Sequence, residues 1–396
     1  MIKWKIEQAI TFCDDVKDGT HDSPKHVSNG YKLLTSKHIT NGVIDTKTAK
    51  TISPIDYETI NKRSKVDVND ILFSMIGTIG SVCRIASEPN FAIKNMGLFK
   101  VSDEIRSKYL YYYLQSPTAK EYIASATSGS TQQYISLGSL RKFPIKYPSQ
   151  QSDMQRMVEI LDSLQKKITL NNRINDYLAQ LCEVVVGKYC ESGTDCLGDI
   201  CYQVTDKANC EDADLDTYVS TESLLQNKRG RQQATSLPAT GKVTRYATGD
   251  TLVSNIRPYF KKVWYAPFDG TCSGDVLVFR ANSIEYAPYL HACLRQDRFF
   301  DHVMRGAKGT KMPRGDKKQM MEFNVSATCR SEDLSLLNVV LSQIAANDAE
   351  STGLGELRAT LLPKLMSGEI DVSKVKLPMQ LNNHLFESVI SCQLRF

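Results

Sequence analysis

The sequence predicts a mixed α+β fold that occurs twice along the chain: two tandem globular domains, each followed by a long helix, with the two helices packing as an antiparallel coiled coil. A single offset of 180 residues aligns distant parts of the chain without a gap. Short strand signals dominate both globular stretches, and a heptad-like apolar pattern follows each of them. The predicted segments are residues 1–150 (first domain), 151–190 (first helix), 191–330 (second domain), 331–370 (second helix) and 371–396 (tail).

The internal repeat is recognised because one register holds through both globular and helical sequence. Residues 70–76 lie over residues 250–256, and residues 98–100 lie over residues 278–280. In the helices the same offset places Met157, Ile160, Leu161 and Leu164 over Leu337, Val340, Leu341 and Ile344. Chance could produce any one of these matches but not a constant register, so the chain is a tandem duplication.

The sequence predicts that each globular half consists mostly of strands and loops, with one helix. The strand signals are short, alternating and rich in β-branched or aromatic residues. We expect strands within residues 71–76, 82–86, 252–256, 262–266 and 275–280, and helices near residues 104–115 and 288–295. Long polar loops separate them at residues 18–30, 126–134, 228–241 and 306–318. Loops of this length are usually functional or disordered.

The first long helix is predicted from apolar residues that recur three and four positions apart. This seam consists of Met154, Met157, Leu161, Leu164 and Ile168. Asn171 stands where the seam predicts an apolar residue, and a polar seam residue helps to fix register at some cost in stability. The alternative interpretation is that this segment is an ordinary core helix that crosses a single domain.

The second long helix has a less regular pattern. Residues 347–355 contain two glycines and several polar residues, so we expect a break or a frayed turn there. Leu354, Leu357 and Leu361 restore the apolar stripe, and Gly368 ends it.

Composition is that of a soluble protein with a mildly basic balance. The hydrophobic fraction is 41%, the charged fraction 23% and the net charge +5, which permits a polyanionic partner without requiring one. We find no apolar run of membrane-spanning length and no secretory signal, so we expect a cytoplasmic protein without a membrane partner. The eleven cysteines form no C-x-x-C pair, and we assign no metal ligand.

The two loops near the end of each globular half are the main candidates for a binding surface. The loop of residues 305–318 is basic and glycine-rich, which suits close approach to phosphates. Its repeat partner, residues 128–134, is uncharged but offers hydroxyl and amide groups that can pair with bases. The alternative is two solvated loops without a ligand. The candidate residues are Ser128, Ser130, Thr131, Gln132, Gln133 and Tyr134 in the first loop, and Lys308, Thr310, Lys311 and Arg314 in the second.

Three further groups of residues have the chemistry of a nucleic-acid surface, although each could equally be plain solvated surface. They are Arg257, Tyr259 and Lys261; Arg229 and Arg231; and Lys32 and Lys37.

Sequence motifs of known catalytic sites are missing. There is no N-P-P-[YF] or D-P-P-Y tetrapeptide of an amino-methyltransferase, no G-x-S-x-G elbow and no H-E-x-x-H helix, which points away from an enzyme.

With these features together, the chain resembles the DNA specificity (S) subunit of type I restriction-modification systems over nearly its whole length. The most specific matches are residues 361–370 (LLPKLMSGEI), which close the second helix, and residues 18–24 (DGTHDSP). Residues 249–258 and 272–275 also resemble that family's target recognition domain. The sequence departs from the family pattern by leaving little room for a helix before the first domain, so how the helix pair is completed at that end stays open.

The resemblance implies a recognition subunit without catalytic residues. Each globular half would be a target recognition domain that reads one half of an interrupted site in double-stranded DNA. The helices would set the spacing and dock two methyltransferase subunits, with or without two restriction (motor) subunits. This chain would bind no cofactor: S-adenosylmethionine belongs to the methyltransferase partners, and ATP and Mg to a motor subunit. The expected partner-binding positions are Leu161, Leu164, Ile168, Ile174, Leu178, Leu341, Ile344, Leu357 and Leu361.

Two other classes of function remain as alternatives. One is a non-catalytic protein-interaction scaffold or decoy, which would assemble through its helices without sequence preference on DNA. The other is a free-standing DNA-modifying enzyme with an unrecognised site, which would methylate or cleave DNA without partners.

Overall fold

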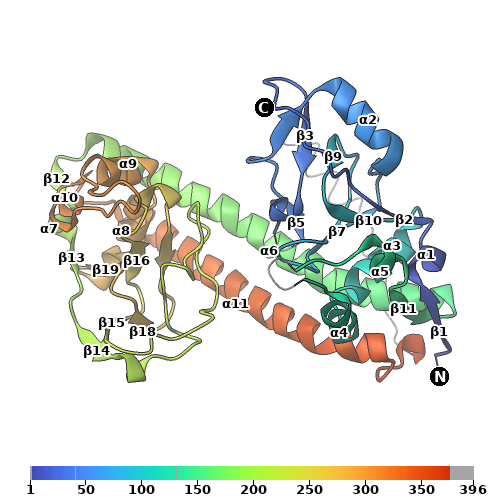
Figure 1. Cartoon of the computed structure of the whole chain (residues 1–396). Coiled ribbons are helices and arrows are strands. Elements are labelled where there is room, and N and C mark those ends of the chain that lie inside the picture. Colours follow the sequence, from blue (N-terminus) through green and yellow to red (C-terminus); the bar gives the residue numbers. More distant parts are fainter. Residues whose placement is uncertain (1, 41, 130–132, 375–396) are drawn as a thin grey trace, which may run out of the picture. The chain divides into compact units, whose positions relative to one another are not determined.

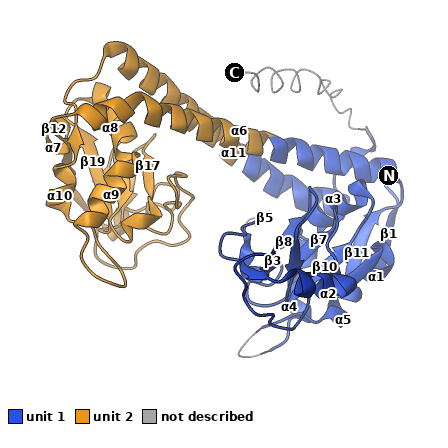
Figure 2. Cartoon of the chain, turned by 90° about the horizontal axis from the view of Figure 1, so that it is seen from above, with its two compact units in different colours: residues 1–166, 354–396 blue, residues 167–353 orange. Residues whose placement is uncertain are grey.

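The structure is a computed structural model that describes residues 2–40, 42–129 and 133–374. It divides into two compact units, which Figure 2 distinguishes by colour. Unit 1 contains Met1–Lys166 and Leu354–Phe396, and unit 2 contains Lys167–Gly353. Each unit therefore combines one globular half with a stretch of both long helices. The predicted tail lies mostly in residues 375–396, outside the described residues.

Unit 1 is built around a four-stranded antiparallel sheet with the order β2-β10-β7-β8 (Figure 1). A second sheet, β6-β3-β9, contains the parallel pair β3 and β9. Its elements are β1 (Trp4–Gln8), α1 (Ala9–Phe12), β2 (Asp15–Asp18), β3 (Tyr31–Leu34), η1 (Ser36–His38), β4 (Ile39–Thr40), β5 (Val43–Ile44), β6 (Lys50–Ile52), α2 (Pro54–Ser64), β7 (Ile71–Ser74), β8 (Val82–Arg84), β9 (Phe91–Ile93), β10 (Met96–Lys100), α3 (Glu104–Tyr113), α4 (Pro117–Ala126), α5 (Leu137–Arg141) and β11 (Pro144–Pro148).

The helices of unit 1 begin where the local sequence supplies a cap. Ser53, Asp103 and Ser116 each accept a hydrogen bond from the backbone N–H three residues later, at the starts of α2, α3 and α4. Such caps satisfy N–H groups that have no partner inside the helix. Proline follows both serines, at a position where its fixed φ suits the first turn.

Unit 2 repeats this plan with a central sheet in the order β13-β19-β16-β17. Its second sheet, β14-β15-β18, is antiparallel throughout. Its elements are β12 (Asp195–Cys196), α7 (Leu197–Ile200), β13 (Cys201–Gln203), β14 (Lys207–Asn209), η2 (Cys210–Asp212), β15 (Lys242–Tyr246), β16 (Thr251–Ser254), η3 (Pro258–Phe260), β17 (Val263–Tyr265), β18 (Gly270–Cys272), β19 (Val276–Ala281), η4 (Ile284–Tyr286), α8 (Ala287–Leu294), α9 (Asp297–Arg305), α10 (Lys317–Met321) and β20 (Asn324–Val325).

The tandem duplication is confirmed at the level of strand register. Leu72 of β7 lies opposite Leu98 of β10, and Leu252 of β16 lies opposite Val278 of β19, so both pairs keep the offset of 180 residues. α5 and α10 begin at Leu137 and Lys317, at the same offset. The predicted α+β fold class is therefore confirmed. The domain boundaries stay a prediction, because the compact units cut through the helices rather than at their ends.

The two long helices are α6 (Gln151–Ser192) and α11 (Ser331–Ser367). In unit 2 they run antiparallel, since Lys167 pairs with Glu350 while Lys188 pairs with Asp333. In unit 1 the same direction follows because Arg358 donates to Gln165 and Lys146, just before α6, donates to the Ser367 carbonyl. After α11 only η5 (Val372–Lys374) is described.

The expected break at residues 347–355 is wrong, because α11 continues through Gly353 and Gly355. Each glycine costs a helix about 1 kcal/mol relative to alanine, and packing against a partner helix outweighs that cost. Asn347, Glu350 and Ser351 all accept hydrogen bonds from Asn171 of α6, which pins this stretch in helical form.

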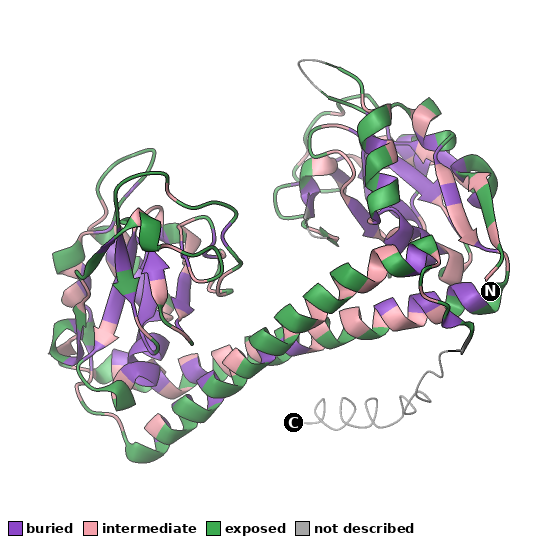
Figure 3. Cartoon of the chain, turned by 90° about the horizontal axis from the view of Figure 1, so that it is seen from below, coloured by how far each residue is buried: buried purple, intermediate pink, exposed green. Residues whose placement is uncertain are grey.

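Each unit has its own core, visible as buried segments in Figure 3. In unit 1 the core between sheet and helices includes Met157 and Leu161 of α6 and Leu365 of α11. In unit 2 it includes Val186 of α6 and Leu337 of α11. The helices are thus integral to each domain's core. None of the described helices is long and apolar enough to cross a membrane.

Candidate nucleic-acid interface

The candidate surface is built at the end of the central strand of each unit. Ser74, the last residue of β7, donates its hydroxyl to the Ile76 carbonyl at 3.2 Å, and Ser254 of β16 does the same to Ile256 at 3.2 Å. Ile76 then forms a backbone bridge with Tyr134, and Ile256 forms one with Arg314. The repeat therefore places one predicted loop of each unit against the same strand end.

Each of these loops closes into a short hairpin, which we call the terminal hairpin (residues 128–134 in unit 1 and 308–314 in unit 2). Ser128 and Tyr134 exchange two backbone hydrogen bonds of 2.9 Å, and Lys308 and Arg314 exchange two of the same length. The second residue of each hairpin is a glycine with φ near 98°, a conformation that side chains rarely adopt. Among the described residues, the two hairpins share the paired ends and the left-handed glycine, but they differ in side-chain chemistry.

In unit 2 the turn after β16 lies against the terminal hairpin. The Arg257 N–H donates to the Pro313 carbonyl at 2.8 Å. Arg257 and Lys261 flank η3 with φ values of 51° and 50°, in the left-handed region. A non-glycine residue there costs roughly 1–2 kcal/mol. The repeat position of Arg257 in unit 1 is Gly77, with φ of 80°.

A third segment completes the surface of unit 2 on the other side of this turn. The Asn227 N–H donates to the Phe260 carbonyl, and the Lys228 N–H donates to the Lys261 carbonyl, both at 2.8 Å. Residues 225–231, 255–261 and 308–314 are therefore linked by backbone hydrogen bonds. The structure brings together three stretches that the sequence offered as separate candidates.

Three of the predicted cations of this surface already form ion pairs. Lys308 pairs with Asp316 at 3.3 Å, Arg314 with Asp275 at 3.1 Å, and Lys261 with Asp297 at 2.8 Å. The Lys308 side chain remains 85% exposed, so its pair is readily exchanged for a phosphate. Thr310 and Lys311 lie exposed at the tip of the hairpin.

The Arg231 side chain packs against its own domain and is not presented on the candidate surface. Its guanidinium lies 5.1 Å from the centre of the Trp264 ring and 4.9 Å from that of Phe268, and it donates to the Asp216 carbonyl at 2.6 Å. Burial lowers the pKa of Arg231, although a guanidinium keeps its charge at neutral pH. Arg229 is exposed and donates to the Gln226 carbonyl.

Arg257 and Tyr259 are the residues of this turn with groups free to meet a ligand. Among the described residues the Arg257 guanidinium has no ion pair or hydrogen bond, and its Nε is buried without an acceptor. The Tyr259 side chain is 47% exposed.

In unit 1 the hairpin presents Ser128, Gln133 and Tyr134, all of them exposed. Ser130, Thr131 and Gln132 lie outside the described residues. The structure does not place Lys32 or Lys37 on this frame. Lys32 lies on β3, where it donates to the Thr51 hydroxyl at 3.1 Å, and Lys37 lies exposed on η1.

The predicted partner-binding residues of the helices differ in exposure. Leu161 and Leu341 are buried in the cores of their own units, which leaves them no side-chain surface for a partner. Leu164, Ile168, Leu178, Ile344 and Leu361 are partly buried, whereas Ile174 and Leu357 are exposed. The predicted partner-binding positions did not include the exposed apolar residues Tyr177, Leu181 and Val184, which continue from Ile174 along α6 at spacings of three and four.

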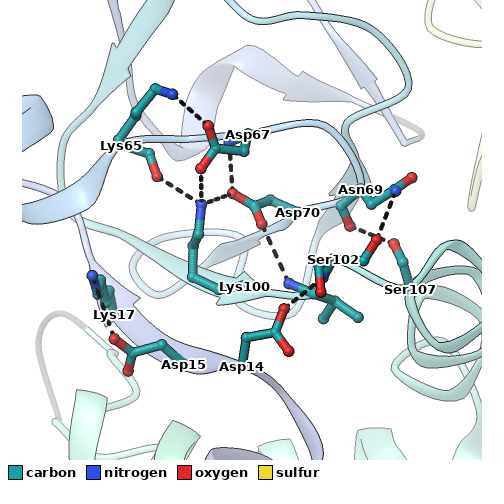
Figure 4. Close-up of polar contacts among 11 residues, drawn as sticks. Asp14, Asp15, Lys17, Lys65, Asp67, Asn69, Asp70, Lys100, Ser102 and Ser107 are labelled. Carbon is teal, nitrogen blue, oxygen red and sulfur yellow. Dashed lines mark hydrogen bonds and ion pairs between the residues drawn. The ribbon is translucent and has the colours of Figure 1, made fainter.

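A buried ion pair at the base of each central sheet was also missed. In unit 1 Lys100 bridges Asp67 and Asp70 at 2.6 and 2.5 Å (Figure 4). Burial raises the pKa of Asp70, while the hydrogen bond from Lys100 lowers that of Asp67. At the repeat positions in unit 2, Arg280 clamps Asp250 through two hydrogen bonds of 2.7 Å. These pairs hold the strands β7 and β16 that carry the candidate surface.

Unit 2 also has a cleft of about 550 Å³ between α6, α8 and the 225–230 loop. Glu183 lies in it and accepts from Lys228 at 3.0 Å and Arg295 at 3.1 Å. No signal in the sequence joined these three residues, which lie far apart along the chain. Among the described residues there is no group of three or more side chains suited to hold a metal ion.

Comparisons with known proteins give one consistent family. Residues 22–180 match the family model of the type I restriction modification DNA specificity domain. The type I restriction enzyme EcoBI specificity subunit of Escherichia coli is 27% identical over 182 residues, which are 42% of this chain and 35% of that protein. The match thus spans about a third of that relative's length.

A solved structure agrees with this at the level of the fold. The S subunit of a type I restriction-modification system from M. genitalium matches with a TM-score of 0.50 and 17% identity, covering 92% of this chain and 96% of that one. The HsdS subunit from Thermoanaerobacter tengcongensis is 13% identical, with a TM-score of 0.37 and coverage of 93% and 97%. The resemblance predicted from the sequence is confirmed.

Proposed function

The chain is related to the DNA specificity subunits of type I restriction-modification systems, and from this premise we propose that it reads a bipartite site in double-stranded DNA. Each globular half reads one half of the site, and the long helices fix the distance between the two readings. Methylation and cleavage belong to partner subunits that work in the cytoplasm.

The observation that carries this proposal is the shared frame of the two terminal hairpins. Equivalent strand ends hold Tyr134 and Arg314 by the same backbone bridges, yet one hairpin is uncharged and the other cationic. A duplicated frame with changed side chains is what two readers of different half-sites require. Phosphate contacts fix a protein's register on DNA, and contacts to base edges carry sequence information.

In the second domain we assign phosphate contacts to the exposed cations of the hairpin, Lys308 and Lys311, with Arg229 beside them. Thr310 and Tyr259 can add hydroxyl contacts to phosphate or base edges. In the first domain Gln133 and Tyr134 present an amide and an exposed aromatic ring, and glutamine pairs well with the edge of adenine.

We further propose that the helices dock two methyltransferase subunits. The exposed apolar residues Ile174, Tyr177 and Val184 of α6 offer a surface of the kind that contacts a protein partner. Leu357 stands at the repeat position of Tyr177 on α11 and is exposed as well, so each helix offers one such position. This arrangement suits two copies of one partner. S-adenosylmethionine would be bound by those partners and not by this chain.

A salt titration of DNA binding tests the assignment of the hairpin. Lys311→Ala should weaken binding to all sequences alike, and the slope of log Kobs against log salt should fall by about 1. Lys242→Ala, at an exposed lysine that begins β15, is the control and should leave both unchanged. If Lys311→Ala leaves affinity and slope unaltered, the hairpin does not contact DNA. Assembly with partners but no sequence preference on DNA would instead indicate a scaffold.

A further inference from the structure

Three positions of the shared frame are uncharged in unit 1 and cationic in unit 2. Ser128 corresponds to Lys308 and Tyr134 to Arg314, at the base of the hairpins. The third pair is Gly77 and Arg257, one residue beyond the bridging isoleucine. Ile76 and Ile256 make the same kind of backbone bridge, so these three pairs occupy matching places, although the turn that follows is one residue longer in unit 2 and contains η3.

Carboxylates of unit 2 neutralise two of these three cations. Lys308 is paired with Asp316, and Arg314 with Asp275. The guanidinium of Arg257 has no such partner among the described residues, and its Nε is enclosed without an acceptor. A guanidinium that is left unpaired in a partly enclosed position is unfavourable unless a ligand completes it.

The backbone at Arg257 is strained as well. Its φ of 51° and ψ of 63° are left-handed, and the residue precedes Pro258. The hairpin holds this conformation through the bond from the Arg257 N–H to the Pro313 carbonyl, and the turn holds it through the bond from the Phe260 N–H to the Arg257 carbonyl. Strain held in place by its surroundings is found mostly at functional sites.

The equivalent position in unit 1 shows that the frame itself does not need a side chain here. A Cβ built on Gly77 would meet nothing within 4 Å, so a side chain at this position enters open space beside the hairpin. Glycine adopts the left-handed conformation without strain. Unit 1 therefore forms its turn without a side chain at this position, whereas in unit 2 the partly enclosed Arg257 guanidinium keeps donors available for a ligand.

We propose that Arg257 is the specificity-determining residue of the second domain and reads a guanine in the major groove. This inference rests on the proposed function. The planar guanidinium can donate two hydrogen bonds to O6 and N7 of guanine, a pattern that no other base pair offers at that position. Lys311 contributes binding affinity through a phosphate contact, and Arg257 contributes sequence specificity through a base contact.

The test uses the full chain in its methyltransferase complex and a library of randomised DNA duplexes, with bound duplexes sequenced. The variants are Arg257→Gly, Arg257→Lys and the control Asn95→Gly, which also removes a left-handed side chain, with φ of 53°, from the turn between β9 and β10, outside the candidate surface. In both Arg257 variants the preference for G·C at one position of the second half-site should fall about 5- to 150-fold. The first half-site should not change. Arg257→Gly should not lower the melting temperature, and Asn95→Gly should keep the full motif.

Each other result overturns the proposal in a distinct way. If the wild-type complex selects no motif, the proposed function fails and this inference fails with it. If the wild type selects a bipartite motif that both Arg257 variants retain, or whose second half lacks a required G·C pair, only the role of Arg257 is overturned. A uniform loss of affinity with a reduced salt slope would make Arg257 a phosphate contact.

Discussion

Individual residues show which polar groups hold the fold and which are left for a ligand. Asp250 is almost fully buried, and its carboxylate is satisfied by Arg280 and by the Ala247 N–H. In unit 1 Asp70 meets Lys100 and the Asp67 N–H, so the duplication preserved both the ion pair and the turn beside it. A buried carboxylate depends on its partner, because an unpaired charge in the interior is costly.

Removal of the arginine should therefore destabilise unit 2 strongly. We expect Arg280→Ala to lower the free energy of unfolding by about 3 kcal/mol, since Asp250 stays buried without a counter-ion. The control is Arg298→Ala, whose pair with Glu191 is exposed on both sides and should contribute no more than about 1 kcal/mol. Urea denaturation followed by circular dichroism compares the two. Equal losses would mean that the Asp250 pair is not a structural clamp.

The sequence identified the residue types of the candidate surface but not their pairing. Arg257, Tyr259, Lys308 and Lys311 were all selected from composition and spacing. The carboxylates that neutralise Lys261 and Arg314 lie 36 and 39 residues away along the chain. Such partners are set by tertiary contacts, which local patterns do not encode. The strain at Arg257 was invisible for the same reason, since φ depends on the hairpin that holds the turn.

At the scale of elements, the long helices combine apolar packing with a polar layer. The seam of α6 predicted both its length and the exception at Asn171. The structure shows what the exception does: the buried Asn171 amide donates to Glu350 at 2.8 Å, and also to Ser351 and the Asn347 carbonyl. The break expected at residues 347–355 was wrong because propensity was judged without this partner helix.

Loss of this layer should weaken the helix pair within unit 2. We expect Asn171→Ala to lower the free energy of unfolding by about 1 kcal/mol, because the Asn347 carbonyl, Glu350 and Ser351 on α11 lose a buried donor. Asn172→Ala, at the exposed neighbouring position, is the control and should change stability by less than about 0.5 kcal/mol. Thermal unfolding of both variants measures the difference in stability. If Asn171→Ala is as stable as the control, the hydrogen bonds of Asn171 do not stabilise the helix pair.

The start of α11 should give the chain a measurable acid dependence. Asp333 accepts from the Tyr189 hydroxyl at 2.5 Å and pairs with Lys188 and Arg330, and these bonds lower its pKa to about 2 from 3.8. A depressed pKa stabilises the fold above the unfolded value, and this stabilisation is lost as pH falls from about 4 to 2.

Asp333→Asn should therefore lower stability at pH 7 by about 1–3 kcal/mol and flatten the loss of stability between pH 4 and 2. Glu332→Gln, at an exposed residue of the same turn, is the matched control. Chemical denaturation at several pH values measures both effects. An unchanged pH profile for Asp333→Asn would contradict the assignment.

At the scale of the whole molecule, the duplication explains what the sequence could predict. The constant offset of 180 residues led to the prediction of two similar domains and two helices. The inner strands of the two central sheets (β7 with β16, β10 with β19), α5 with α10, and the starts of α6 and α11 obey this offset. The remaining strands were not predictable in this way. β3 and β9 form a parallel pair in unit 1, whereas β14, β15 and β18 are antiparallel in unit 2, so the register was lost where the two copies diverged.

The duplication also predicts independent readings by the two domains. Each globular half has its own core and its own terminal hairpin, while both units draw on the same two helices. An exchange of one globular half should change what that half reads and should leave the other half and the spacing alone.

The most direct test is to co-express the chain with a methyltransferase subunit and to map methylated adenines by sequencing, before and after residues 1–150 are exchanged for those of a relative. Two recognition domains on one pair of helices should give an interrupted motif. After the exchange, one half of the motif should change, while the other half and the spacer length stay the same. A continuous motif unaffected by the exchange, or no methylation at all, would contradict the claim that two recognition domains are carried on one spacer.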